Sequence, residues 1–149
     1  MLSITTEGAQ IARQFRMKSL IEIEAKINQL AAKIAATKYL LPTFGKTQDS
    51  ARPHIETDSR GYHYVVVERG EELKRETTQD LDELLFHVLQ SITFSLACDY
   101  ECAHRVRGQD SRRLIFKRQI ELLSQLSPAW AQRASRRQEH VLQQHPFND

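Results

Sequence analysis

Cysteine is scarce in this chain of 149 residues, which contains only Cys98 and Cys102. The two lie four residues apart within a stretch of helical periodicity, so they do not form a disulfide framework. Such low cysteine usage is typical of a reducing compartment. Two thiols are also fewer than the four ligands of a structural zinc site. We therefore expect a cytoplasmic protein without structural zinc.

Long apolar runs are missing as well. No segment approaches the roughly 20 consecutive apolar residues of a membrane helix, and the first 20 residues lack the apolar stretch of a secretory signal. Glycine and proline number only five and four, and no repeat or low-complexity segment is visible. These absences predict one domain over residues 1–149 with no membrane partner, in which residues 1–16 are a poorly specified N-terminal extension.

Recognisable catalytic motifs are equally absent from the sequence. It contains no G-x-S-x-G elbow, no glycine-rich phosphate loop and no H-E-x-x-H helix. His63 lies between two tyrosines just before three valines and is interpreted as a sheet or core-edge histidine, and His145 in "HPFND" as part of a terminal clasp. We expect no catalytic residues, no cofactor and no small-molecule substrate, and therefore no enzyme.

Two carboxylate–histidine pairs have spacings that suit a metal site. Glu101 and His104 are three residues apart, and Glu83 and His87 are four apart. Di-iron helical proteins need such pairs on facing helices, but both pairs fall in one predicted helix. Their 18-residue separation is about 27 Å along a helix axis. We therefore interpret them as polar positions on one helix and predict no metal.

Charge is distributed unevenly, although the net charge is only +2. Residues 53–83 carry a net −5, whereas residues 1–52 carry +4 and residues 103–149 carry +5. Six cations gather around one helix junction and fit either a nucleic-acid patch or an internal salt-bridge network; they are Arg105, Arg107, Arg112, Arg113, Lys117 and Arg118. The low overall basicity makes nucleic acid an unlikely partner.

Hydrophobic periodicity predicts an α+β fold dominated by helices. A three-stranded antiparallel meander is expected at about 53–58, 62–69 and 72–78, with an apolar central strand and a charged edge strand. Four helices are expected at about 18–38, 79–105, 110–126 and 128–143. The last three helices have start signals, which are in order a Thr77–Asp80 capping box, a cap at Asp110 or Ser111, and Ser127 before Pro128. Pro42 is expected to end the first helix.

Seven segments occur in an order that resembles a known family. They are "LLPTFG", "ARPHIE", "GYHYVVVERGEE", "TTQDLDELLF", "ITFSLACDYE", "HRVRGQDSRRLIF" and "HPFND", across about residues 39–149. Together they resemble the immunity protein 63 family of bacterial polymorphic toxin systems. The resemblance implies a non-catalytic protein without a cofactor, whose partner is a cognate toxin domain, often a nuclease. "GQDSRR" is interpreted as a brace at a helix junction.

A basic nuclease cleft would be matched by carboxylates on its inhibitor. The acidic segment therefore supplies the predicted partner-binding residues, with two tyrosines of one strand face as possible aromatic anchors or core residues; these are Glu68, Glu71, Glu72, Asp80, Asp82, Glu83, Tyr62 and Tyr64. The alternative to a toxin inhibitor is a small nucleic-acid-binding or regulatory module that uses the basic C-terminal helices.

Overall fold

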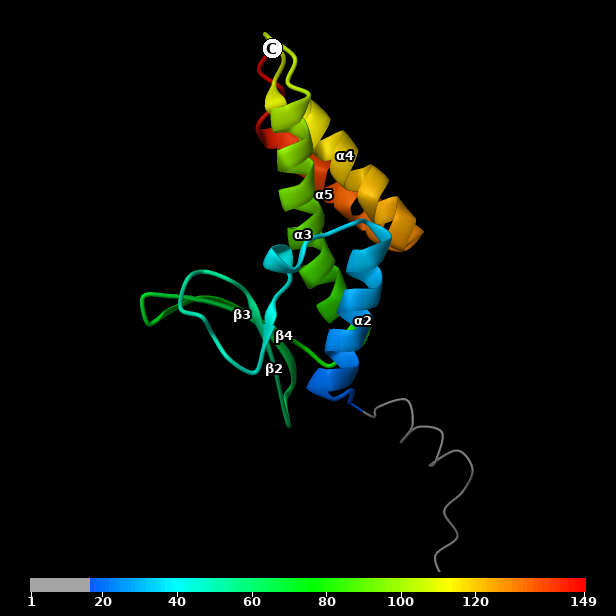
Figure 1. Cartoon of the computed structure of the whole chain (residues 1–149). Helices are drawn as coiled ribbons and strands as arrows, with labels where there is room; N and C mark the ends of the chain where they lie inside the picture. The colour runs from blue at the N-terminus through cyan, green and yellow to red at the C-terminus, as the bar shows by residue number, and fades with distance from the viewer. Residues whose placement is uncertain (1–16) are drawn as a thin grey trace, which may run out of the picture.

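The computed structural model describes residues 17–149, so the predicted extension at residues 1–16 lies outside the described part. Helices α3, α4 and α5 lie alongside one another, with α2 beside the first half of α3 and a small sheet to one side (Figure 1). The α+β class with four helices is confirmed for this part of the chain. The helices are α2 (Leu20–Lys33), α3 (Leu81–Ala103), α4 (Ser111–Leu126) and α5 (Pro128–Gln144), with one 3-10 turn, η1 (Lys38–Leu40).

The sheet has four strands rather than the three predicted, in the order β1–β2–β3–β4. The predicted meander is present and antiparallel, as β2 (His54–Asp58), β3 (Gly61–Glu68) and β4 (Glu71–Thr78). The prediction missed β1 (Thr43–Phe44), which pairs in parallel with β2 and makes the sheet mixed. A strand of two residues is too short to show an alternation of apolar and polar side chains, so the sequence does not reveal β1. It is held beside β2 because the amides of Thr43 and Gly45 donate to the carbonyls of Pro53 and Ile55.

Glycine is required at the turn between β2 and β3. Gly61 has a φ of 135°, and a Cβ atom there would lie 2.5 Å from the carbonyl oxygen of Thr78 on β4. A side chain would therefore collide with backbone that is already fixed by the sheet. The close approach locks the start of β3 against the end of β4.

The first helix ends earlier than predicted, at Lys33 rather than residue 38. Ala35 takes a left-handed conformation with a φ of 53°, and the amide of Ala36 donates back to the carbonyl of Ala31. This local turn stops the helix, so Pro42 is not its terminator. Its start is a capping box between Ser19 and Glu22.

Caps at the other helices largely follow the sequence. Asp110 caps α4 and Ser127 caps α5, directly before Pro128. The predicted capping box at Thr77 is wrong: Asp80 caps α3 by accepting from the amide of Asp82. Thr77 is instead a residue of β4, where its hydroxyl bonds His63.

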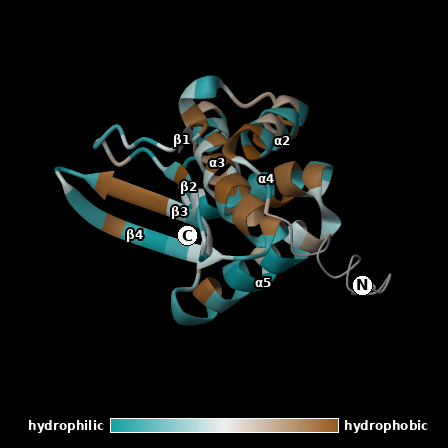
Figure 2. Ribbon diagram, turned by 90° about the horizontal axis from the view of Figure 1, so that it is seen from below, coloured by the Kyte–Doolittle hydropathy of each residue, from teal (hydrophilic) through white to brown (hydrophobic). Residues whose placement is uncertain are grey.

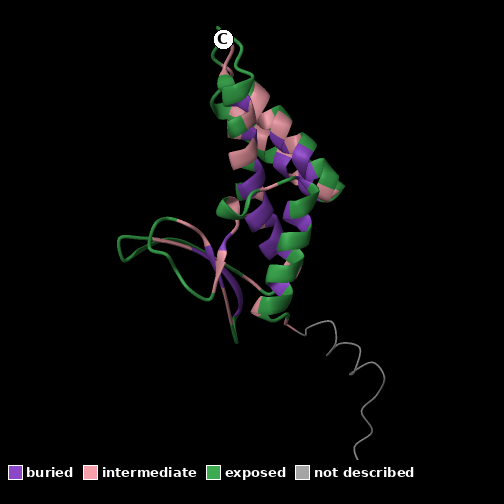
Figure 3. Cartoon of the chain, viewed as in Figure 1, coloured by how far each residue is buried: buried purple, intermediate pink, exposed green. Residues whose placement is uncertain are grey.

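The core lies between the sheet and the helices, with buried residues concentrated on α3 and the inner strands (Figure 3). Ile55, Tyr62 and Tyr64 project from the helix-facing side of the sheet onto α2 and α3. β4 is an exposed edge strand of mostly polar residues beside the apolar β3 (Figure 2), as predicted. The central strand is buried on both faces because His63 and Val65 are covered as well.

Helix α3 is long and apolar enough to cross a membrane by length and composition. Its apolar stripe is instead buried in the core of the domain, since Leu84, Phe86 and Leu89 have no exposed surface. Leu85, Val88 and Ile92 are also buried. The stripe that the sequence displays is thus the central packing surface of the domain.

Candidate functional site

The predicted carboxylates fall into two groups at opposite ends of β4. Glu68, Glu71 and Glu72 surround the turn between β3 and β4, whereas Asp80, Asp82 and Glu83 lie at the start of α3. The eight residues of β4 separate the groups by about 25 Å, at roughly 3.3 Å per residue. The structure therefore does not bring the acidic segment together as one surface.

The carboxylates at the start of α3 already have partners within the domain. Asp80 is the helix cap, and Asp82 accepts a hydrogen bond from the indole Nε1 of Trp130 at 3.2 Å. Glu83 forms a bidentate pair with Arg133 of α5, with Nη2 at 2.7 Å, and this pairing lowers the pKa of its carboxyl group. Asp82 and Glu83 thus fasten α3 to α5, and all three carboxylates are already engaged within the domain.

At the strand turn, two carboxylates are free and one is engaged. Glu72 holds Arg75 through two hydrogen bonds of 2.8 and 3.0 Å, and Arg75 also reaches Glu56 at 3.2 Å. The neighbouring guanidinium lowers the pKa of Glu72. Glu68 and Glu71 are exposed and have no ion pair within the described residues. They are the predicted carboxylates best placed to meet a partner.

Tyr62 and Tyr64 belong to the core and do not present their rings on the surface. Their exposed fractions are 2% and 4%. The hydroxyl of Tyr62 accepts a hydrogen bond from the amide of Lys18 at 2.8 Å, and burial raises the pKa of Tyr64. The possibility that they are exposed aromatic anchors is therefore corrected, because the same strand face carries the apolar contact with the helices.

The histidines and cysteines form no cluster of metal ligands. His63 bonds Asp58 and Thr77 at 2.8 Å each within the sheet, as predicted for a sheet histidine. Both carboxylate–histidine pairs lie on α3 and its C-cap. Within residues 17–149, no group of three histidine, cysteine or acidic side chains is placed to hold an ion. Cys98 and Cys102 are both free.

Most of the basic cluster is neutralised inside the domain. Arg105 pairs with the buried Glu101, and Arg118 pairs with Glu121. Arg112 holds Asp110 with three hydrogen bonds, and Arg113 pairs with Asp149. Of the two readings, a nucleic-acid patch or a salt-bridge network, the structure favours the network.

The C-terminal segment forms a clasp over the start of α4, which we define as residues 145–149 with Asp110, Arg112 and Arg113. Arg112 donates to the carbonyls of His145 and Pro146 at 2.7 and 2.8 Å. The Arg113 guanidinium lies 4.1 Å from the centre of the Phe147 ring. Both interpretations, of "HPF" as a clasp and of "GQDSRR" as a brace, are confirmed.

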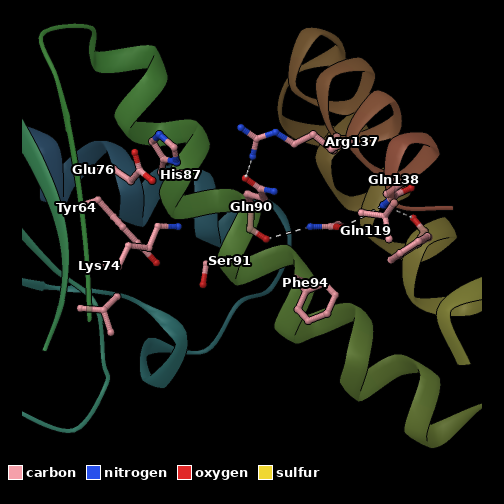
Figure 4. A pocket seen from close by; sticks show the side chains of 14 residues that line it. Tyr64, Lys74, Glu76, His87, Gln90, Ser91, Phe94, Gln119, Arg137 and Gln138 are labelled. Atoms are coloured by element: carbon pink, nitrogen blue, oxygen red, sulfur yellow. Dashed lines mark hydrogen bonds between the residues drawn. The ribbon is translucent and has the colours of Figure 1, made fainter. Parts of the chain in front are cut away.

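A concave feature that was not anticipated from the sequence lies beside the sheet. A cleft of about 440 Å³ opens between the β3–β4 hairpin and the helices (Figure 4). Its wall on the sheet is formed by Tyr64, Val66, Lys74 and Glu76, its floor mainly by α3, and its far wall by α5. We call it the hairpin cleft.

One sequence signal pointed toward the hairpin cleft. Phe94 lies off the buried stripe of α3 and is 45% exposed, whereas Phe86 is fully buried. The far wall adds Val141 of α5, which is 40% exposed. The volume lies within the range of about 300–1,000 Å³ that is usual for binding sites.

The region that matches a family model contains most of these features. The model of the family described as immunity protein 63 matches residues 58–140, from the last residue of β2 through most of α5. No curated protein and no solved structure matches the chain. The matched region contains the β3–β4 turn, the lining of the hairpin cleft except Val141, and the network between α3 and α5, whereas the C-terminal clasp extends beyond it.

Proposed function

Because the chain belongs to the immunity protein 63 family, we propose that it binds a cognate bacterial toxin directly and stoichiometrically and so protects the cell that makes the toxin. The observation that carries this proposal is the family match over residues 58–140, which is more than half of the chain. We further propose that the protein acts in the cytoplasm, because its few cysteines suit a reducing compartment.

A nuclease is the toxin class that the charges favour. Glu68 and Glu71 are exposed carboxylates at the β3–β4 turn that have no ion pair among residues 17–149, so they are available to attract a basic surface. Enzymes that bind phosphate backbones present such surfaces, and complementary charge accelerates encounter between proteins. The two carboxylates would therefore contribute mainly to the association rate.

The alternative of a nucleic-acid-binding module has less support. Its candidate surface would need free cations on the C-terminal helices, but Arg105, Arg112, Arg113 and Arg118 contact carboxylates. Of the six clustered cations, Arg107 and Lys117 have no ion pair within the described residues, and on α5 Arg136 and Arg137 also have none. Because four of the six clustered cations are already matched by carboxylates, the cluster is a weak footprint for phosphate binding.

Co-expression with the toxin domain encoded beside this gene tests the proposal. We expect survival of the cells, and we expect an inactivated toxin domain to elute with this protein as a one-to-one complex on gel filtration. Cell death together with separate elution of the two proteins would refute the immunity function.

A charge-reversal variant tests the nuclease proposal at the level of rates. Glu68→Lys with Glu71→Lys should lower the association rate at low salt by about tenfold and flatten its salt dependence. Glu24→Lys with Glu139→Lys makes the same charge change at exposed positions on α2 and α5 and is the matched control. An equal effect of both pairs would show that only net charge matters and that the turn is not the steering surface.

A further inference from the structure

The hairpin cleft holds two cations that have no carboxylate partner within the described residues. Lys74 stands on β4 with its Nζ atom 5.6 Å from the centre of the Tyr64 ring. Arg137 stands on α5 and donates to the neutral Oε1 atom of Gln90 at 2.7 Å. Elsewhere on the helices, arginines such as Arg112 and Arg133 are matched by acids. These two cations are therefore available to an incoming anion.

The remaining titratable groups of the cleft do not cancel this positive charge. Glu76 is the one carboxylate in its lining, against two cations. His87 lies on the floor, where burial lowers its pKa despite the nearby Glu83, so it is neutral at pH 7. Two cations and one carboxylate leave the cleft with a net charge of +1. An acidic group is thus the favoured occupant.

Apolar surface accompanies the charge. Phe94 on the floor and Val141 on the far wall are 45% and 40% exposed, so both offer apolar surface to an occupant of the cleft. Val66 adds a partly buried aliphatic group from the sheet. An occupant that complements the cleft therefore needs an apolar side chain next to its carboxylate.

The far side of the cleft is held rigidly by glutamines that join three helices (Figure 4). Gln119 of α4 donates to the Gln90 carbonyl at 3.1 Å, and Gln138 of α5 donates to Gln119 at 3.1 Å. Gln119 is itself buried. Because these hydrogen bonds brace the helical side of the cleft, less free energy is lost in ordering that side when a partner binds.

A second hollow continues the cleft along the sheet. It has a volume of about 430 Å³, shares Tyr64, Val66 and Ser91 with the hairpin cleft, and is also lined by Tyr39. Tyr39 is 80% exposed, so its ring adds accessible aromatic surface to this hollow. The two hollows together form a groove that is longer than a single side chain requires and suits a segment of polypeptide.

We propose that this groove receives a segment of the toxin that presents an aspartate or glutamate between Lys74 and Arg137, with an adjacent apolar side chain against Phe94. The proposal rests on the immunity function and adds a second contact with the toxin to the one at the β3–β4 turn. The carboxylates of the β3–β4 turn steer the encounter with a basic surface, and the groove holds an acidic and apolar segment of the same partner.

The test measures the dissociation constant for an inactivated toxin domain, first with the wild-type protein. Lys74→Glu with Arg137→Glu should weaken binding by about tenfold or more, mainly through faster dissociation, because charges buried at an interface act on the lifetime of a complex. Arg136→Glu with Lys46→Glu is the matched control, since both residues are exposed and neither lines the groove. The control pair should change the dissociation constant by less than about twofold.

A steric variant separates occupation of the groove from charge. Ser91 is exposed and lines both hollows, so Ser91→Trp fills the groove without changing its charge. We expect this variant to melt like the wild type and to lose binding by about tenfold or more.

Each outcome decides the proposal. Tight wild-type binding that neither groove variant weakens overturns the groove but leaves the immunity function standing. Tighter binding of the charge-reversed pair would show a basic occupant and also overturn it. Sedimentation of the protein alone as a dimer that Ser91→Trp dissociates would assign the groove to a second copy of this chain. Absence of wild-type binding and of protection would refute the immunity function and the groove with it.

Discussion

At the scale of single residues, side chains only a few positions apart on α3 face different surroundings. Ile92 faces the core with an exposed fraction of 2%, and Leu85 faces it with 5%. His87 lies between them in sequence but faces the hairpin cleft, where its ring stacks near Tyr64 at 6.3 Å. Substitutions of Ile92 and Leu85 therefore test the packing of the core, and a substitution of His87 tests the effect of burying a titratable group.

Truncation of the buried stripe should be costly. Ile92→Ala or Leu85→Ala removes aliphatic volume that the surrounding side chains cannot refill, and we expect a loss of about 2–5 kcal/mol in the free energy of unfolding. Chemical denaturation measures this loss. The control is Ile21→Ala on α2, whose side chain is 80% exposed and should cost less than about 0.5 kcal/mol. Equal midpoints for Ile92→Ala and Ile21→Ala would contradict the packing described for α3.

His87 should make stability depend on pH near neutrality. Burial lowers its pKa in the folded state, with Glu83 opposing the shift, whereas the unfolded chain titrates near about 6.5. Between the unfolded pKa and the lower folded pKa, the unfolded state binds a proton that the folded state does not bind. The free energy of unfolding therefore decreases as the pH falls through this range.

Denaturation of His87→Gln at pH 7 and pH 5 checks this dependence. We expect the variant to lose less stability between the two pH values than the wild type does. His140→Gln, which alters an exposed position on α5, should behave like the wild type. A wild-type slope in His87→Gln would assign the pH dependence to other groups.

At the scale of elements, the ends of helices matter as much as their faces. The start of α4 and the end of the chain stabilise each other, because Asp110 accepts from the amides of Arg112 and Asn148 at 2.9 Å each. Its own amide donates to Asp149 at 2.7 Å. The C-terminus therefore lies beside the loop between α3 and α4, as Figure 1 shows. One aspartate serves as helix cap, ion-pair partner and anchor for the tail.

Removal of this aspartate should loosen two elements at once. Asp110→Ala removes the helix cap and the anchor of the tail, and we expect a loss of about 1–2 kcal/mol from the cap alone. Hydrogen exchange should become faster in the first turn of α4 and at residues 145–149. Ser111→Ala, at the exposed first helical position, is the control. Unchanged exchange in the tail of Asp110→Ala would mean that the clasp does not depend on Asp110.

At the scale of the whole molecule, charge is arranged for internal pairing in one part and for contact in another. Arg133, Arg112 and Arg105 join helices or loops through carboxylates. Glu68, Glu71 and Lys74 around the β3–β4 hairpin and Arg137 on α5 are among the charges that have no ion pair within the described residues. The hairpin and the facing side of α5 thus offer charge to a partner.

The purified protein should accordingly carry no metal and show no hydrolytic activity of its own. Both carboxylate–histidine pairs lie on α3 and its cap, so they cannot converge on one ion. Elemental analysis after dialysis against a chelator measures bound metal, and nuclease and protease assays measure activity. Stoichiometric zinc or iron retained after that dialysis would contradict this prediction.

The elements themselves were largely predictable from sequence, because each depends on neighbours a few residues away. The run of aromatic and β-branched residues in "GYHYVVVER", the period of α3 and the caps at Asp110 and Ser127 are local patterns, and they place most elements to within one or two residues. The end of α2 was missed because an alanine, rather than a glycine, adopts the left-handed turn.

The sequence by itself therefore determined the helices, the meander and the family. Only the tertiary structure decided the parallel partner β1, the burial of both tyrosines and the choice of which charges are free. Glu83 and Glu71 look alike in the sequence, yet one is bound by Arg133 of α5, 50 residues away, and the other has no ion pair within the described residues. The hairpin cleft was hidden for the same physical reason, since its walls come from β3, β4, α3, α4 and α5 and exist only once long-range packing brings those elements together.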